Sequence, residues 1–182
     1  MKSILQKEEK ILRMVAKEVP LKDIKSLKIK KILKEMSTAL KSQSDGVALA
    51  APQIGYGLRI FIVSGRIFEK SFGKKKPTNL EEEEQEMKEK IKDAVFINPK
   101  ISKLSKVKEW MPEGCLSVRP LYGQTLRHKK ATVEAYDENG LKFIRGASGL
   151  LAQIFQHETD HLNGILFIDH AKNVKEEKIP NE

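Results

Sequence analysis

The chain has 182 residues, of which 40% are hydrophobic and 32% are charged. This length and apolar content allow one substantial core, so we expect a single domain over residues 1–182. One cysteine excludes a framework of internal disulfide bonds. The first residues lack the unbroken apolar stretch of a signal peptide, and no apolar run is long enough to span a bilayer. The sequence therefore predicts a cytoplasmic protein without a membrane segment.

The net charge of +9 is concentrated near the N-terminus. Residues 1–45 hold twelve Lys and Arg residues against six Asp and Glu residues. Within them, residues 25–41 place apolar side chains on one arc of a helix and lysines on the other, which predicts an amphipathic helix. The lysines fit an attraction to ribosomal RNA, and they also fit a surface that only maintains solubility. We favour the second explanation, because few aromatic residues are interleaved with these lysines.

Five segments are rich in the residues typical of strands: 59–64, 94–98, 100–108, 131–136 and 141–145. A hairpin turn is predicted at Glu138, Asn139 and Gly140, between the last two segments. Farther along, Ser148 can cap a helix that ends at residues 163–164. Antiparallel strands around such a helix predict an α+β fold.

Residues 65–92 differ in composition from the rest of the chain. They contain lysines at 74–76, glutamates at 81–84, and a helix capping-box pattern at Thr78 and Glu81. We interpret them as an exposed, charged insertion that is partly helical or partly disordered, because charge runs are usually solvated. The polar tail after Asp169 is expected to be frayed.

The segment 46–55 reads Gly-Val-Ala-Leu-Ala-Ala-Pro-Gln-Ile-Gly. Small residues between two glycines let the backbone approach another surface closely. Gln53 adds an amide that can donate to a developing oxyanion. Taken alone, the segment is explained better by tight packing than by catalysis.

The strongest motif is His-Glu-Thr-Asp-His at residues 157–161, an H-E-x-x-H pattern. Its two imidazoles are four residues apart, so they share one helix face and can bind the same metal. At about 100° per residue, His157, Glu158 and His161 fall within the apolar stripe of the helix. We therefore expect all three side chains to face the core.

Two histidines leave room for a third protein ligand. Cys115 is the natural candidate, because it is the only cysteine and stands in the segment Glu-Gly-Cys-Leu-Ser. Three protein ligands leave a fourth position for water, which indicates hydrolysis by a metal-activated water. Glu113 and Gln156 flank the ligands, so each either orients them or is simply solvated.

Taken together and in this order, three segments closely resemble the signature motifs of the peptide deformylases: 46–55, 113–117 and 156–162. The resemblance spans most of the chain apart from the charged insertion and the tail. It implies antiparallel β-sheets around a central C-terminal helix that carries the H-E-x-x-H motif. It implies three metal ligands, which are Cys115, His157 and His161. It also implies that Glu158 is the general acid and base, and that Gln53 and the backbone N–H of Leu116 form the oxyanion hole.

The resemblance further implies a substrate groove formed by Gly46, Val47, Ala48, Leu150 and Gln153. Val47, Leu150 and Gln153 match positions that line the methionine pocket of the family. Two departures affect this groove: Ala48 stands where the family usually has glycine, and Arg119 stands where it commonly has proline. Polar Gln153 is also unusual at its position.

The same resemblance implies a cofactor and partners. It favours ferrous iron as the native ion, while ligand softness also allows zinc, nickel or cobalt in a site of one thiolate and two imidazoles. The implied substrates are nascent N-formylmethionyl polypeptides, with the ribosome as a candidate partner through the basic surface. We expect a monomer.

Two other functions fit part of the pattern. A metallopeptidase also uses H-E-x-x-H, but it draws its third ligand from a downstream residue, for which His170 is the only later histidine. A catalytically inactive binding protein of the same fold is the second alternative. The Cys115 segment and Gln53 argue against the first, and the complete set of site residues argues against the second.

Overall fold

The computed structural model describes residues 2–68 and 92–177, in which two α-helices and two antiparallel sheets form an α+β fold. The helices are α1 (Leu27–Lys41) and α3 (Gly149–Leu162). The strands are β1 (Ala48–Ala50), β2 (Ile60–Val63), β3 (Ala94–Leu104), β4 (Lys108–Gly114), β5 (Leu121–His128), β6 (Lys130–Tyr136), β7 (Lys142–Ser148) and β8 (Lys172–Glu176). Most of the charged insertion, including its capping-box pattern, lies outside the described residues.

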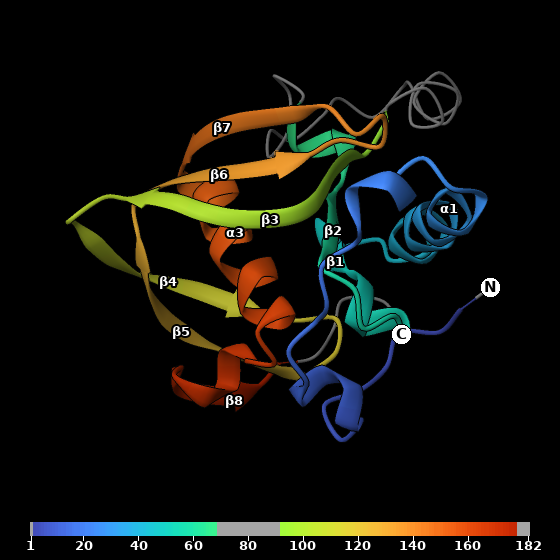
Figure 1. The fold of residues 1–182 in the computed structure, drawn as a ribbon. Coiled ribbons are helices and arrows are strands. Elements are labelled where there is room, and N and C mark those ends of the chain that lie inside the picture. The colour runs from blue at the N-terminus through green and yellow to red at the C-terminus, as the bar shows by residue number, and fades with distance from the viewer. Residues whose placement is uncertain (1, 69–91, 178–182) are drawn as a thin grey trace, which may run out of the picture.

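The H-E-x-x-H helix α3 is central, as the sequence predicts (Figure 1). A five-stranded sheet has the order β1-β2-β3-β6-β7, and a three-stranded sheet has the order β4-β5-β8. Helix α3 packs against strands of both sheets, with contacts to β1, β3, β6 and β7 in one and to β5 in the other. The helix therefore brings its side chains between two layers that separate them from water.

Aromatic packing fixes α3 against the larger sheet. Phe155 of α3 is fully buried, and its ring centroid lies 5.2 Å from that of Phe96 on β3. Phe96 in turn stacks on Phe61 of β2 at 4.6 Å. Offset and edge-to-face rings at these distances add to the stabilisation from apolar burial. These contacts hold α3 against β2 and β3 of the larger sheet.

Helix α1 is the predicted amphipathic helix. Ser26 caps its first turn, because the Ser26 hydroxyl accepts the Ile29 N–H at 3.3 Å. Ile29, Ile32 and Met36 are buried against the core, while the lysines of the helix remain exposed. None of the described helices is long and apolar enough to cross a membrane.

The predicted break between residues 98 and 100 is wrong, because β3 continues through it as a bulge. Asn98 adopts a positive φ of 51° at this point. Its side chain accepts the Val19 N–H and donates to the Val19 carbonyl, both at 2.8 Å. These two hydrogen bonds to Val19 stabilise the left-handed backbone of Asn98, so that the strand continues past the bulge.

Sequence patterns missed β1, β4, β5 and β8. β4 and β5 contain Glu113, Thr125 and Arg127, buried polar residues that do not read as a strand interior. The tail after Asp169 is not frayed throughout, since β8 pairs with β5. Its side chains are exposed, so the pairing rests on backbone hydrogen bonds that hydropathy does not reveal.

Both ends of α3 lie where the sequence predicts. The helix begins after Ser148, although the Ser148 hydroxyl makes no capping hydrogen bond. Its last residue is Leu162, Asn163 is the C-cap, and Gly164 follows with a left-handed φ of 74°. Arg59 secures this end, because its guanidinium donates to the Leu162 carbonyl at 3.2 Å and to the Asn163 side chain at 2.9 Å.

Candidate metal centre

The three residues implied as metal ligands converge on one point. Cys115 follows the end of β4, whereas His157 and His161 project from adjacent turns of α3. One ligand atom from each residue lies within 4.8 Å of the other two. The Cys115 Sγ is 3.1 Å from the His161 Nε2. One thiolate and two imidazoles in this arrangement suit a divalent transition metal and leave a coordination position open.

Glu113 fixes the orientation of His157. Its Oε1 lies 2.7 Å from the His157 Nδ1, which leaves the His157 Nε2 to face the ligand cluster. A carboxylate behind a ligand imidazole sets its tautomer and makes it a stronger ligand. The prediction that Glu113 orients a ligand is therefore supported by its contact.

A buried arginine neutralises this carboxylate. The Arg127 guanidinium donates to both Glu113 oxygens, at 2.6 and 3.0 Å, and to Asp160 at 2.6 Å. Thr125 donates to Glu113 Oε2 at 2.6 Å. Burial opposes ionisation of Glu113, but the hydrogen bonds from His157 and Arg127 outweigh it and hold the pKa of Glu113 well below its usual range. Glu113 thus stays charged beneath the site.

The two histidines respond differently to burial. Burial lowers the pKa of His161 well below its ordinary value, so that this imidazole is neutral and available as a ligand. The same effect on His157 is outweighed by hydrogen bonds with Cys115 and Glu113, which raise its pKa. A bound metal competes with the proton at His157, because a ligand imidazole must be neutral.

Glu158 is buried beside the ligands, at 3% exposure. Its Oε2 is one of two buried side-chain atoms in the described residues that have no hydrogen-bond partner; the other is the His161 Nδ1. Burial raises the pKa of Glu158 to about 7, opposed by the charge of His157 and reinforced by Glu113 and Asp160. A carboxyl group with this pKa can accept and donate a proton near neutral pH.

Gln53 approaches the ligands from the segment after β1, whereas the two histidines lie on α3. It lies in the short 3-10 helix Ala51–Ile54 directly after β1 and is 2% exposed. Its Oε1 accepts the Ala50 N–H at 2.8 Å, and its side-chain NH₂ lies 3.5 Å from the Cys115 Sγ. The segment 46–55 is therefore tightly packed and also places an amide donor beside a ligand.

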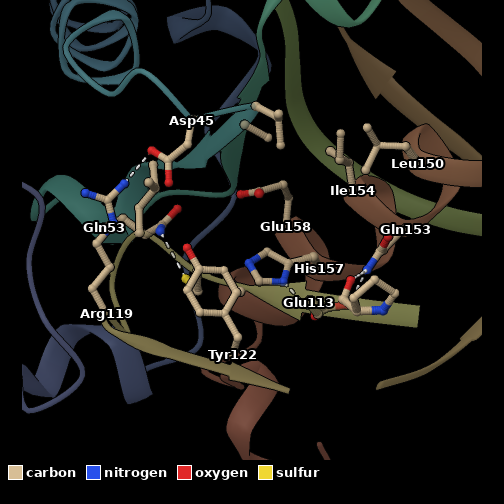
Figure 2. A pocket seen from close by; sticks show the side chains of 17 residues that line it. Asp45, Gln53, Glu113, Arg119, Tyr122, Leu150, Gln153, Ile154, His157 and Glu158 are labelled. Carbon is tan, nitrogen blue, oxygen red and sulfur yellow. Dashed lines mark hydrogen bonds and ion pairs between the residues drawn. The ribbon is translucent and has the colours of Figure 1, made fainter. Parts of the chain in front are cut away.

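A pocket opens over the ligands (Figure 2). Its lining includes every residue predicted for the substrate groove, and also Leu116: Gly46, Val47, Ala48, Leu116, Leu150 and Gln153. Asp45 and Arg119 lie at one side of the view, His157 and Glu158 at the centre, and Leu150, Ile154 and Gln153 at the other side. Leu150 and Ile154 thus lie away from the ion pair of Asp45 and Arg119.

The three unusual residues each have a defined position. The Arg119 guanidinium donates to Asp45 at 2.5 Å and to Gln43 at 3.0 Å, so it is fixed to the segment that precedes Gly46. Ala48 is a buried residue of β1 and lines the pocket. Gln153 donates to the Pro112 carbonyl at 2.8 Å and to Glu113 at 3.1 Å, so its amide belongs to the network beneath the ligands.

Gln156 has a different contact from Glu113. It exchanges hydrogen bonds with the backbone of His128 on β5, both at 2.9 Å. It therefore orients a strand and does not contact a ligand imidazole. Sequence reasoning missed Arg127, Asp160 and Tyr122; the only sequence signal for Arg127 is its alternation with Thr125 on the inner side of β5.

Tyr122 explains the glycine that precedes Cys115. A Cβ added at Gly114 would lie 2.4 Å from the Tyr122 ring. Gly114 and Tyr122 are directly paired across β4 and β5. The glycine therefore leaves room for an aromatic ring against the strand that leads to Cys115, at the wall of the pocket.

The family model of polypeptide deformylases matches residues 1–177. Peptide deformylase 2 of Clostridium acetobutylicum is 36% identical over 169 residues, which cover 93% of this chain and 94% of that protein. The chloroplastic peptide deformylase 1A of Solanum lycopersicum is 34% identical over 169 residues, covering 93% of this chain and 59% of that protein. The crystal structure of a peptide deformylase from Legionella pneumophila superposes with a TM-score of 0.75 at 31% identity, covering 95% of this chain and 87% of that one.

A Cys-His-His centre with a buried glutamate, set between two antiparallel sheets, defines a metal-dependent hydrolase. Its ligand set and the match over nearly the whole chain identify the kind of hydrolase. The chain belongs to the polypeptide deformylase family.

Proposed function

We propose that the chain removes the formyl group from the N-terminal N-formylmethionine of newly synthesised proteins, with formate as the other product. The observation that carries this proposal is the convergence of Cys115, His157 and His161 on one point, beneath a pocket lined by Cys115, His157, Glu158 and Gln53. When bound, a divalent metal polarises the formyl carbonyl and makes water acidic enough to react near neutral pH. The remaining work belongs to side chains of this protein.

Glu158 is the general acid and base. It takes a proton from the attacking water and delivers a proton to the nitrogen that leaves as a free amine. A carboxyl group whose pKa burial raises to about 7 suits both transfers. Its free Oε2, buried at the pocket lining, is the atom available for them.

Gln53 and the Leu116 N–H stabilise the oxyanion. Attack on the formyl carbon places negative charge on its oxygen, and an amide donor fixed in advance costs little reorganisation at that moment. The Gln53 Oε1 accepts the Ala50 N–H, the Gln53 NH₂ lies beside Cys115, and Leu116 follows Cys115 at the pocket lining.

The apolar side of the pocket accepts the methionine side chain. Val47, Leu150 and Ile154 supply apolar surface there. The Gln153 side-chain NH₂ donates to the Pro112 carbonyl and to Glu113. An apolar substrate side chain therefore leaves neither of these donors without a partner. Gly46 and Ala48 lie where a peptide backbone can run past β1.

Ferrous iron is proposed as the native metal. Thiolate and imidazole donors accept iron, zinc, nickel or cobalt, and the residues around the site do not distinguish them. Iron beside a thiolate is sensitive to oxidation. Protein prepared in air should therefore lose activity that ferrous-loaded, anaerobic protein retains.

A metallopeptidase is a weaker candidate. His170 contacts Asp160 at 3.4 Å and is not part of the ligand cluster formed by Cys115, His157 and His161. The third donor is thus a thiolate upstream of the H-E-x-x-H motif. This donor set fits a deformylase and not the downstream ligand of such peptidases.

We further propose a cytoplasmic monomer that meets its substrates at the ribosome. The exposed lysines of α1 offer a basic surface that can approach ribosomal RNA. A related protein is named chloroplastic, so the compartment varies between relatives. Co-sedimentation with ribosomes that weakens with added salt would support the association.

The test of the catalytic roles is Glu158→Gln in protein loaded with one equivalent of ferrous iron. The amide keeps the size of the side chain but cannot transfer the proton, so kcat should fall by about 10²–10⁴. Metal content measured by atomic absorption should not change. Glu176→Gln on exposed β8 is the matched control and should retain full activity. Full turnover by Glu158→Gln would refute the proposed role.

A further inference from the structure

Ser117 is a buried polar residue beside the metal ligands for which the mechanism above has no role. It is fully buried, at 0% exposure. Its hydroxyl accepts a hydrogen bond from Gln53 Nε2 at 3.1 Å. Its backbone N–H donates to Cys115 Sγ at 3.4 Å. One residue therefore touches both the proposed oxyanion donor and a ligand thiolate.

The Gln53 amide is held at both of its polar atoms. Its Oε1 accepts the Ala50 N–H at 2.8 Å, and its Nε2 donates to Ser117. A carboxamide is planar, with two hydrogens on nitrogen in fixed directions. Once one of them is engaged by Ser117, the other is directed toward Cys115, whose Sγ lies 3.5 Å from Nε2.

The Ala50 contact alone does not fix this direction. A single hydrogen bond at Oε1 permits rotation about the last bond of the Gln53 side chain, because terminal torsions of this type are broad. The contact with Ser117 limits that rotation. Since the residues lining the pocket in the described part of the chain do not include Ser117, its hydroxyl does not take part in substrate binding.

We propose that Ser117 is a positioning residue that holds the second Nε2–H of Gln53 over the ligand cluster, beside Cys115, where the oxyanion forms. This inference rests on the proposed function, in which Gln53 is an oxyanion donor. Charge on the formyl oxygen develops mainly in the transition state. A misdirected Gln53 amide therefore lowers kcat and leaves KM nearly unchanged.

The proposal is tested by a double-mutant cycle in iron-loaded protein with a formyl-Met-Ala-Ser peptide. Ser117→Ala should lower kcat about five- to ten-fold, the effect of one hydrogen bond, with KM within about two-fold. Gln53→Ala should lower kcat about 10²–10³-fold. In the Gln53→Ala background, Ser117→Ala should cost less than about two-fold, because Ser117 acts only through Gln53.

Two further readouts separate positioning from a structural role. Ser117→Ala removes one oxygen and leaves the Ser117 N–H to Cys115 in place, so bound iron should match that of the unmodified protein and the melting temperature should fall by only a few degrees. An equal loss of kcat in both backgrounds, or a loss that follows metal content, would overturn the positioning role alone. Full kcat in Gln53→Ala would instead overturn the oxyanion role, and this inference with it.

Discussion

Glu113 shows how one carboxylate can serve a metal site without binding the metal. It accepts hydrogen bonds from four side chains: Thr125, Arg127, Gln153 and His157. Two of these partners, Arg127 and Gln153, come from different elements, so the carboxylate joins β5 and α3 beneath the ligands. A buried charge needs this many partners, because an unpaired one costs several kcal/mol.

Glu113→Gln should weaken metal binding. The amide supplies a weaker acceptor to the His157 Nδ1–H and cannot balance the charge of Arg127, so metal affinity should fall about 10–100-fold. Competition with a chromophoric chelator measures this change. Glu109→Gln is the matched control, since Glu109 lies on the same strand but is exposed. Equal affinities for both variants would show that Glu113 does not support the ligands.

The same carboxylate should also make stability depend on pH. The pKa of Glu113 is lowered on folding from 4.5, so its stabilisation is present above about pH 4.5 and is lost as pH falls below it. In metal-free protein at pH 7, Glu113→Gln should lower the free energy of unfolding by about 3–5 kcal/mol, as expected for a broken buried ion pair. Urea unfolding should show the difference narrowing toward pH 3. A difference that stays constant from pH 7 to pH 3 would contradict this linkage.

Most metal-site residues could be predicted because their signals are local. His157, Glu158 and His161 share one helix face, and Cys115 is the only thiol. Arg127 could not be predicted, because its role depends on the register in which Gly123 opposes Glu113 across β4 and β5. Asp160 gave no signal either, since it meets Arg127 only after α3 packs on β5.

At the scale of elements, the end of α3 determines where the ligands sit. Gly164 has a φ of 74°, and a Cβ there would lie 2.7 Å from the Arg13 carbonyl oxygen. The N-terminal segment also meets this end, because the Ala16 N–H donates to the Leu162 carbonyl at 2.9 Å. The segment that contains Arg13 and Ala16 therefore packs directly against the C-terminal end of α3.

Gly164→Ala should destabilise the fold. The left-handed backbone and the close Arg13 carbonyl together should cost at least about 1–3 kcal/mol in the free energy of unfolding. Urea denaturation of the metal-free protein measures it. Gly57→Ala is the control, because a Cβ at Gly57 meets nothing within 4 Å and its φ is not left-handed. Equal stability of the two variants would show that the Gly164 turn relaxes without cost.

Helices and strands with a regular apolar pattern were easier to predict than strands whose buried face carries polar residues of the site. α1, β2, β6 and β7 were found close to their observed bounds, since apolar periodicity marks them. β4 and β5 were missed because their inner faces carry the polar network of the site. The break after Asn98 was predicted wrongly because the hydrogen bonds between Asn98 and Val19, which stabilise the bulge in β3, join residues far apart in the sequence.

At the scale of the whole molecule, two sheets enclose one functional helix. The larger sheet holds α3 through the Phe155 cluster, and the smaller sheet carries Glu113 on β4 and Arg127 on β5, with Cys115 directly after β4. The third part of the site, Gln53, comes from the segment after β1. The α+β class could be predicted, but the division of strands between two sheets could not, because pairing partners depend on long-range register.

The most direct test of deformylation is formate release from a formyl-Met-Ala-Ser peptide by anaerobic, ferrous-loaded protein. Formate and free amino termini should appear in equal amounts, disappear after a chelator removes the metal, and return when ferrous iron is restored. An acetyl-Met-Ala-Ser peptide should release far less acetate. Protein that holds one metal per chain and releases no formate would contradict the account.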